Sequence, residues 1–591
     1  VRNRDGIHGE PAVPPHIEEA WKYRQLSGIL ENAVKAPVRQ LLEKNSSLSR
    51  RYREATSEYA EKSAWSHLIS RTERSIDMRQ ALQGWKLTVK KIGKGTGKNA
   101  GRLRAEARRL MSRCQQAVPA WIMPVSKAME SLDPAVNRFD ILIIDEASQS
   151  DISALSVLYM AKKVIIVGDD RQVSPMAVGV ELDTLNNLNQ MYISGVIPNS
   201  QLYDAKTSLY DIAATTFQPL MLREHFRCVP GIIGFSNMLS YDGRILPLRD
   251  ASDSPLAPAV VDLKVENGMR DSRGKTNPAE ARKTVSLLRA CLETPEYSRS
   301  TFGVISLLGD DQAKLTEKMI YESIDIREID SRQILCGNAS DFQGDERDVI
   351  FLSLVDSAVS SDGKNPGPLK LQGYGPDDAF RKRYNVAASR ARDQLWVISS
   401  LDPSTDLKAG DIRKTLIDYA ADPEAFIEDR SPSGNATELE TEISSRLKEL
   451  GFNITAGRRV GGYRLDMTVS SDAASVAIEC SGAADITGSD AVRYESRLDM
   501  ERQTILERIG WHFIRVRASE YYLDPESAVK RVTDELAGYG IRPDGGLVKT
   551  EPVETDNGSL LSRVLARAAE IEAGENAGEE DPSFNSAPYI T

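Results

Sequence analysis

The sequence predicts an α/β protein built on buried parallel sheets. From about residue 115 onward, short apolar runs rich in Val and Ile alternate with stretches of helical periodicity. Continuous runs of this kind are typical of parallel strands that helices cover on both faces. The chain of 591 residues is long enough for about three to five domains of ordinary size.

The composition is that of an ordinary globular protein, with 27% charged residues, 41% hydrophobic residues and a formal net charge of −11. These fractions exclude a mainly disordered chain. No stretch reaches the ~20 apolar residues of a membrane helix. The first thirty residues carry Glu, Asp, Pro and His where a signal peptide needs an apolar centre.

The cysteines lie far apart in the sequence, and none belongs to a CxxC pair. They are Cys114, Cys228, Cys291, Cys336 and Cys480. This spacing disfavours both a zinc site and a disulfide framework. We therefore expect a cytoplasmic protein in a reducing compartment.

The first predicted region, residues 1–113, is a helical arm, because its apolar residues recur three and four positions apart. The end of the arm, residues 86–113, is basic, with ten Lys or Arg against the single acid Glu106. Such a patch in an acidic protein predicts either a nucleic-acid contact or merely a solvated helix face. The candidate contacts are Lys90, Lys91, Lys94, Lys98 and Arg102.

Five apolar runs are the expected strands of two domains, residues 114–215 and 216–402. The runs are FDILII (139–144), VIIV (164–167), FGVIS (302–306), DVIFLSLV (348–355) and QLWVIS (394–399). After a linker at 403–436, a second α/β pattern occupies 437–545. Residues 546–591 predict an acidic, mostly disordered tail with one helical island, LLSRVLARAAEIE.

Polar groups follow the first two of these strands. Asp145 and Glu146 come directly after one strand, and Gly168, Asp169 and Gln172 follow the next. Ligands of open α/β sheets bind at the carboxyl ends of the strands. An Asp at this edge can hold Mg²⁺ against a phosphate, and the adjacent Glu can polarise the attacking water.

The words DEASQ and GDDRQVSP resemble motifs II and III of superfamily 1 helicases, in the branch of the nonsense-decay and senataxin-type enzymes. Three later words resemble motifs IV, V and VI in the right order: LREHFRCVPGIIGFSN, NASDFQGDERDVIFLSLV and YNVAASRARDQLWVISS. The resemblance covers about residues 115–402. It implies two RecA-like, doubly wound parallel-sheet domains that bind ATP and Mg²⁺ and move 5′→3′ along nucleic acid.

The resemblance also implies roles for individual residues. Asp145 would bind Mg²⁺, Glu146 would activate water, and Gln172, Arg227 and the arginine finger Arg390 would complete the catalytic set. Gly168, Asp169, Gln343, Gly344, Glu346 and Arg392 would bind the nucleotide or couple it to the strand. Glu280 and Gln312 stand where the family has further second-domain signatures.

One family element has no match before DEASQ, namely the phosphate loop GxxxxGK[ST]. The similar word KKIGKGTGKNA has Ile92 in place of the first glycine and Asn99 in place of the Mg²⁺-binding hydroxyl residue. We interpret it as part of the basic patch. With Val as the first residue, we expect the chain to be the C-terminal part of a longer protein and to bind ATP poorly by itself.

The region 437–545 resembles very-short-patch-repair-like endonucleases of the PD-(D/E)XK fold, through LETEISSRLKELGF, GGYRLDM, AIECSG and RQTILERIGWHF. Matching positions make Glu440, Asp466 and Glu479 the candidate metal carboxylates, with Glu479 also the catalytic candidate. Arg497 and Gln503 have weaker support. Such domains usually read ECDG, so Ser481 replaces an acid and puts cleavage in doubt.

The leading hypothesis is an ATP-dependent nucleic-acid helicase or translocase, with DNA as its substrate, coupled to an endonuclease-like domain. It would act in DNA processing, repair or defence, a step that rests on analogy between folds. One alternative is a nucleic-acid-binding scaffold with a degenerate motor and nuclease. The other is an RNA helicase whose last domain is a tether.

Overall fold

The computed structural model describes residues 16–35, 38–93, 95–173, 182–204, 207–249, 254–271, 275–358, 368–375, 378–426, 437–460, 463–470, 475–481, 502–507, 510–543 and 557–579. The chain divides into two compact units, Val1–Ile143 with Ser153–Ile165, and Ile144–Ile152 with Ile166–Thr591. Not one helix in these ranges combines the length and the apolar character that a membrane span requires.

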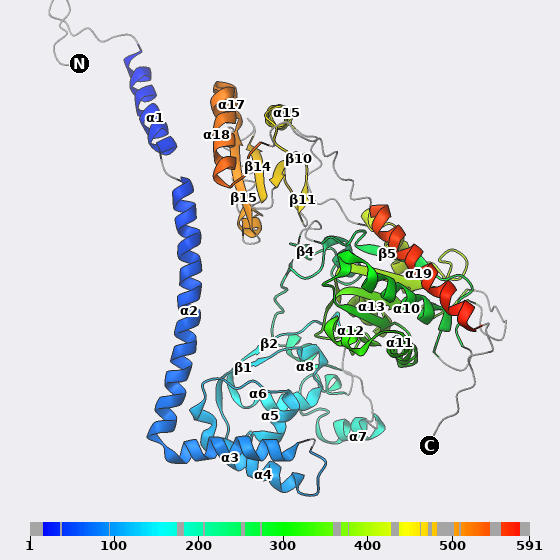
Figure 1. Cartoon of the computed structure of the whole chain (residues 1–591). Coiled ribbons are helices and arrows are strands. Elements are labelled where there is room, and N and C mark those ends of the chain that lie inside the picture. The colour runs from blue at the N-terminus through cyan, green and yellow to red at the C-terminus, as the bar shows by residue number, and fades with distance from the viewer. Residues whose placement is uncertain are drawn as a thin grey trace, which may run out of the picture. The chain divides into compact units, whose positions relative to one another are not determined.

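The first unit is mainly helical, as the periodicity of residues 1–113 predicts (Figure 1). Its helices are α1 (Ile17–Lys35), α2 (Val38–Arg74), α3 (Ile76–Ile92), α4 (Ala100–Cys114), α5 (Val125–Ser131) and α6 (Leu155–Leu158). Helices α3 and α4 form an antiparallel hairpin. Its contact buries Ala81, Ala107 and Met111, small or flexible side chains that let the two helices approach closely.

The hydrogen-bonded pair β1 (Phe139–Ile144) and β2 (Ala161–Ile166) contains the two strands expected from FDILII and VIIV. Phe139 and Leu142 pack against the core of the helical unit. The side chains of Ile141 and Ile143 are exposed, as is that of Ile165. This strand pair therefore leaves part of its apolar surface uncovered by the described residues.

The second unit contains a parallel five-stranded sheet in the order β5-β9-β8-β6-β7. The strands are β5 (Val260–Lys264), β6 (Phe302–Ser306), β7 (Leu335–Asn338), β8 (Arg347–Ser353) and β9 (Ala391–Ser399). The non-sequential order means that helical crossovers connect the strands. This is the doubly wound arrangement expected for residues 216–402.

Alternate residues of each strand enter two different cores, because successive side chains of a strand point to opposite faces. Ile350 and Leu352 of β8 face one core, with helices α9 (Pro230–Ser240), α13 (Ala379–Ala388) and α14 (Ile412–Ala421). Val349 and Phe351 face the other core, with α10 (Pro278–Glu293), α11 (Asp310–Ser323) and α12 (Ile326–Ser331). Both faces are covered, so the apolar runs are continuous.

The helical island of the tail belongs to this second core. Helix α19 (Asn557–Glu579), red in Figure 1, lies along α10 and is longer than the predicted island. It buries Leu560, Val564 and Ala568 against the sheet side of α10. Arg567 pairs with Glu293 of α10 at 2.6 Å. A segment expected in a mostly disordered tail thus completes a core.

The region expected to resemble a nuclease contains the sheet β10-β13-β14-β15, in which β14 and β15 are parallel and the other pairs antiparallel. Its elements are α15 (Glu438–Glu449), β10 (Ile454–Ala456), β11 (Arg459–Val460), β12 (Tyr463–Arg464), β13 (Met467–Ser470), β14 (Ser475–Ser481), β15 (Trp511–Arg517), α17 (Ala518–Leu523) and α18 (Pro525–Gly538). Helices α15, α17 and α18 supply the apolar side chains that cover one face of the sheet.

The remaining elements are short. They are α7 (Leu182–Tyr192), α8 (Leu209–Ala214), and the small parallel pair of β3 (Glu224–His225) and β4 (Leu246–Pro247). Arg227 lies in the short segment between β3 and α9, so these two elements fix the position of its main chain.

Candidate functional site

The carboxyl ends of β1 and β2 lie side by side. The amide of Val167 donates to the carbonyl of Ile144 at 2.8 Å, and the amide of Ala147 donates to the carbonyl of Val167 at 2.8 Å. Gly168 lies at this edge with no room for a side chain, because a Cβ would lie 2.9 Å from the Ser148 nitrogen and 2.9 Å from the Tyr210 ring. The motif II and motif III loops are therefore neighbours.

Asp145 and Glu146 occupy the loop that follows β1. The Glu146 amide donates to Asp145 Oδ1 at 2.9 Å, and Gln149 Nε2 donates to Glu146 Oε2 at 2.9 Å. Glu146 has φ 51, a left-handed conformation that costs energy for a residue with a side chain. Both side chains are exposed or partly exposed, which leaves their carboxylates accessible to a ligand.

Asp169 organises the loop that follows β2. Its carboxylate accepts from the Arg171 amide at 2.9 Å and from Gln172 Nε2 at 3.0 Å. The other amide atom of Gln172, Oε1, is buried and has no hydrogen-bond partner in the part of the chain that is described. A buried acceptor of this kind indicates a position that a ligand or water fills.

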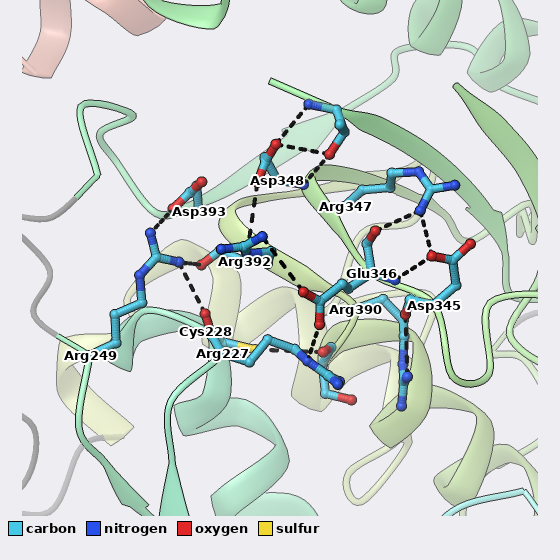
Figure 2. Close-up of polar contacts among 12 residues, drawn as sticks. Arg227, Cys228, Arg249, Asp345, Glu346, Arg347, Asp348, Arg390, Arg392 and Asp393 are labelled. Carbon is cyan, nitrogen blue, oxygen red and sulfur yellow. Dashed lines mark hydrogen bonds and ion pairs between the residues drawn. The ribbon is translucent and has the colours of Figure 1, made fainter. Parts of the chain in front are cut away.

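Arg227 and Arg392 converge on Glu346 from two different segments (Figure 2). Arg227 Nε lies 2.5 Å from Glu346 Oε2, and Arg392 Nη1 lies 3.6 Å from Glu346 Oε1. Arg392 also lies 3.8 Å from Asp348. Glu346 therefore holds Arg227 in place, Arg392 contacts the other oxygen of Glu346, and the side chain of Arg227 is 37% exposed.

Arg390 differs from these arginines, because it forms no ion pair within the described residues. Its Nε donates to the carbonyl of Val386 at 3.1 Å and its Nη1 to the carbonyl of Asp345 at 3.3 Å. Only 3% of the residue is exposed. Burial lowers the pKa of Arg390, the Arg227 charge lowers it further, and the Glu146 charge acts in the opposite direction. Arg390 is thus a buried cation close to another cation.

Gln343 and Gly344 precede β8 in a turn. Gly344 has φ 80, which favours glycine. Gln343 Nε2 is buried without a hydrogen-bond partner among the described residues. The structure gives these two residues no further contact with the carboxylates, so their coupling role stays a prediction.

Glu280 and Gln312 lie in the interior behind β8 and not with the arginines. Glu280 Oε2 accepts from Ser353 Oγ at 2.7 Å and from the Val355 amide at 2.8 Å. Gln312 Oε1 accepts from the Asn277 amide at 2.7 Å. Burial raises the pKa of Glu280 to about 7, against hydrogen bonds that favour its charged form. Glu280 thus fixes the carboxyl end of β8, and Gln312 fixes the segment that leads into α10.

Two residues that sequence reasoning did not single out contact the motif III loop. Tyr241 donates its hydroxyl to Asp169 Oδ2 at 2.6 Å. Asn385 Nδ2 donates to the Arg171 carbonyl at 3.0 Å and to the Tyr241 hydroxyl at 3.0 Å. The sequence could have indicated Asn385, because it lies five residues before Arg390 in the motif VI word YNVAASRAR. Tyr241 carries no sequence signal beyond following α9.

The candidate metal carboxylates of the nuclease-like domain are close to one another. Asp466 Oδ2 accepts from the Cys480 amide at 2.8 Å. Burial raises the pKa of Asp466, and the Glu440 charge raises it further. Gln503 donates to Glu507 and accepts from Arg515. Arg497 lies outside the described residues, as does the side chain of Ser481.

Two arginines neutralise this acidic group. Arg502 Nη2 lies 2.5 Å from Glu479 Oε2, and Arg464 Nη2 lies 3.7 Å from Glu440 Oε2. Arg502 also donates to the carbonyl of Arg464 at 3.1 Å. No three acidic, His or Cys side chains in the described ranges form a group that could hold a metal ion. This arrangement does not fit a preformed Mg²⁺ site.

The motor site fits a bound magnesium nucleotide better. Buried unpaired polar atoms belong to Gln172 and Gln343, and the buried Arg390 has only main-chain partners. Carboxylates stand at one strand edge, and Arg390 is close enough to Glu146 for the charges to interact. Cations and carboxylates that are not paired with one another are the groups that a metal-bound phosphate requires.

The basic residues of the arm separate into two classes. Arg104 pairs with Glu130, Arg109 with Glu106, and Arg113 with Asp77. Lys90, Lys91, Lys98 and Arg102 are exposed around the α3–α4 turn, and Lys94 lies outside the described residues. Three of the ten basic residues are therefore paired with acids, one of them across the α3–α4 hairpin, and the tip of the hairpin presents accessible cations.

Three stretches of the chain match known families. Residues 9–179 match the AAA_11 family and residues 205–402 match the AAA_12 family, both described as AAA domains. Residues 439–536 match the restriction-endonuclease-like family REase_MTES_1575. The two AAA matches contain all five helicase-like motifs.

Several curated relatives are helicases. The "5'-3' DNA helicase ZGRF1" of Mus musculus is 25% identical over 280 residues, which cover 45% of this chain and 13% of the relative. The "Uncharacterized ATP-dependent helicase MG140 homolog" of Mycoplasma pneumoniae is 25% identical over 455 residues, 71% of this chain and 38% of the relative. The mouse "DNA replication ATP-dependent helicase/nuclease DNA2" is 24% identical, covering 48% of this chain and 26% of the relative.

The chain spans less than half the length of each of these relatives. The motif order, the doubly wound sheet and the family matches agree with one another. The chain therefore carries AAA_11 and AAA_12 domains, as helicase relatives do, followed by a domain of the restriction-endonuclease-like family REase_MTES_1575.

Proposed function

We propose that this chain is the motor and nuclease-like region of an ATP-dependent DNA helicase or translocase. The observation that carries the proposal is Arg390, a buried guanidinium with no carboxylate partner in the described residues, close to Arg227 and to Glu146. Keeping two cations near each other costs energy, and an anion between them would recover it.

Each motif residue has a role that its surroundings support. Asp145 would hold the metal, and Glu146 would orient the attacking water, since both carboxylates are accessible at the strand edge. Arg390 and Arg227 would stabilise the charge that develops on the transferred phosphoryl group. Bound Mg–ATP would supply the phosphoanhydride whose hydrolysis drives movement.

Arg227 must leave Glu346 at least in part to perform this role, because its Nε lies 2.5 Å from that carboxylate. Arg392 is a second cation on the same carboxylate and can keep Glu346 neutralised when Arg227 turns away. Glu346 would thus hold Arg227 until a phosphate competes for it.

DNA is the favoured substrate over RNA, because relatives with named substrates include the mouse "5'-3' DNA helicase ZGRF1" and the DNA replication helicase/nuclease. A nuclease-like domain in the same chain agrees with this choice. Phosphate contacts by the tip of the α3–α4 hairpin would add affinity without sequence preference.

The test is hydrolysis of ATP by the intact protein with single-stranded DNA or RNA present. Glu146→Gln should lower turnover by about 100-fold or more while nucleotide binding stays unchanged, because only the carboxylate that activates water is lost. Glu449→Gln, at the exposed end of α15, is the matched control. Equal turnover in wild type and Glu146→Gln would contradict the role of Glu146 in activating water. Stimulation of turnover by RNA and not by DNA would make RNA the substrate.

A second function is favoured for the nuclease-like domain, namely binding of nucleic acid without cleavage. Arg502 is bonded to Glu479, and Arg464 adds a positive charge 3.7 Å from Glu440, so two of the three candidate carboxylates lie beside an arginine. Cleavage of DNA with Mg²⁺ or Mn²⁺, compared between wild type and Asp466→Ala, decides between the two. Activity that disappears in Asp466→Ala supports an endonuclease, and binding without cleavage in both proteins supports the binding domain.

A further inference from the structure

Tyr241 stands at the end of α9 with its hydroxyl between two motifs. Its amide donates to the Asn237 carbonyl at 3.2 Å, and the chain then turns through Asp242 and Gly243, whose φ angles are 51 and 67. The Tyr241 hydroxyl donates to Asp169 Oδ2 at 2.6 Å and accepts from Asn385 Nδ2 at 3.0 Å. The helix end thus fixes the main chain of Tyr241, and two hydrogen bonds fix its hydroxyl.

The two helices next to these contacts, α9 and α13, each adjoin one of the arginines in the chain. Helix α9 begins at Pro230, shortly after Arg227, and α13 ends at Ala388, shortly before Arg390. Ser236 of α9 donates to the Asn385 carbonyl at 3.2 Å, so the two helices are joined to each other. A displacement of either helix therefore moves an arginine.

Asp169 Oδ2 serves two donors at once, the Tyr241 hydroxyl at 2.6 Å and Gln172 Nε2 at 3.0 Å. If Gln172 turns toward a ligand that fills the space near its unpaired Oε1, Asp169 loses one donor. The bond to Tyr241 then becomes the stronger contact of that carboxylate. The hydrogen bonding of the Tyr241 hydroxyl thus depends on the orientation of the Gln172 side chain.

Asn385 donates to the motif III loop and to Tyr241. Its Nδ2 reaches the Arg171 carbonyl and the Tyr241 hydroxyl, whereas its Oδ1 is buried without a partner among the described residues. The reverse orientation would place its oxygen against the Arg171 carbonyl, which has no proton to share. Asn385 is therefore a fixed second connection to the same loop.

We propose that Tyr241 is a positioning residue that couples the Gln172 loop to helices α9 and α13, next to which Arg227 and Arg390 lie in the chain, with Asn385 as its support. The proposal rests on the proposed ATPase function for its consequence in catalysis. The coupling itself is a property of the chain and can be measured with no nucleotide present.

The experiment compares Tyr241→Phe with Tyr419→Phe by amide hydrogen exchange of the full chain. Tyr419 is the matched control, because its hydroxyl donates to the Gly231 carbonyl of the same helix at 2.6 Å and lies elsewhere in the core. Tyr241→Phe should raise exchange about tenfold in residues 168–173 and 389–392, since one hydrogen bond is lost. Tyr419→Phe should leave 168–173 unchanged, and equal exchange in the two variants would overturn the coupling.

Catalysis gives the second readout. Tyr241→Phe should lower kcat about 10- to 100-fold with little change in KM, because substrate contacts remain while the arginines are misplaced. Raised exchange with an unchanged kcat would overturn the positioning role. If wild type hydrolyses no ATP, the proposed function fails, and the exchange comparison still decides the coupling.

Discussion

Arg390 of the candidate motor site and Arg502 of the nuclease-like domain are in opposite surroundings, although Arg227 of the candidate motor site is itself paired with Glu346. In the motor, Arg390 has only main-chain acceptors, and no ion pair joins Asp145 or Glu146 to an arginine within the described residues. In the nuclease-like domain, Arg502 Nη2 lies 2.5 Å from Glu479 Oε2, and Arg464 Nη2 lies 3.7 Å from Glu440 Oε2. Charges that are kept apart can act on a ligand, whereas charges that are paired stabilise the fold.

The largest effect should come from the unpaired cation of the motor. Arg390→Ala should lower ATP turnover by about 1,000-fold or more, the range for an arginine that stabilises phosphoryl transfer. Arg244→Ala is the matched control, because this arginine pairs with the exposed Asp242 at 3.2 Å. Steady-state hydrolysis with DNA in excess is the measurement. A loss below threefold in Arg390→Ala would make Arg390 structural and remove the contrast between the sites.

Releasing an arginine of the nuclease-like site should make that site more like the motor. Arg502→Met keeps the side-chain length and removes the charge beside Glu479, which costs about 3–5 kcal/mol for a buried pair. Mg²⁺ or Mn²⁺ should then raise the melting temperature of the variant and not that of wild type. Arg531→Met is the control, since its partners Glu520 and Glu535 lie in another part of the domain. Equal metal stabilisation of wild type would show that Arg502 does not block a metal.

The hairpin tip contrasts with the paired arginines beside it. Replacing Lys90, Lys91, Lys98 and Arg102 together by Gln should reduce the slope of log K against log salt for single-stranded DNA by about 3. Replacing Arg109 and Arg113 by Gln should change the slope far less, because Glu106 and Asp77 already occupy them. Binding titrations at several salt concentrations measure this. An unchanged slope in the tip variant would mean that these basic residues form a solvated helix face and do not contact DNA.

The smallest expected effect concerns the buried Glu280 behind the sheet. Its pKa in the folded protein is about 7, above the ordinary value of 4.5. The folded state therefore holds the proton more strongly, so the stabilisation is complete below about pH 4.5 and is lost as pH rises through about 7. Glu280→Gln should cost about 1–3 kcal/mol. The difference from wild type in denaturant unfolding should shrink between pH 5 and 8, and a constant difference contradicts the raised pKa.

The sequence was sufficient for the strands, because their apolar runs are local and continuous. Each of the five runs forms a strand, and the residues that follow the first two lie at one edge. It was not sufficient for the state of the charges. The sequence does not distinguish Arg227, Arg390 and Arg502. In the structure, Arg227 contacts Glu346, Arg390 donates to main-chain carbonyls, and Arg502 contacts Glu479.

The sequence by itself therefore determined the fold class, the order of the motifs and the helical arm, since these depend on periodicity and on neighbours along the chain. The tertiary structure decided which acids are paired with arginines, that Tyr241 joins Asp169 to Asn385, and that α19 closes the second core. Such contacts join residues far apart in the sequence. Their energies depend on burial and distance, which no local pattern contains.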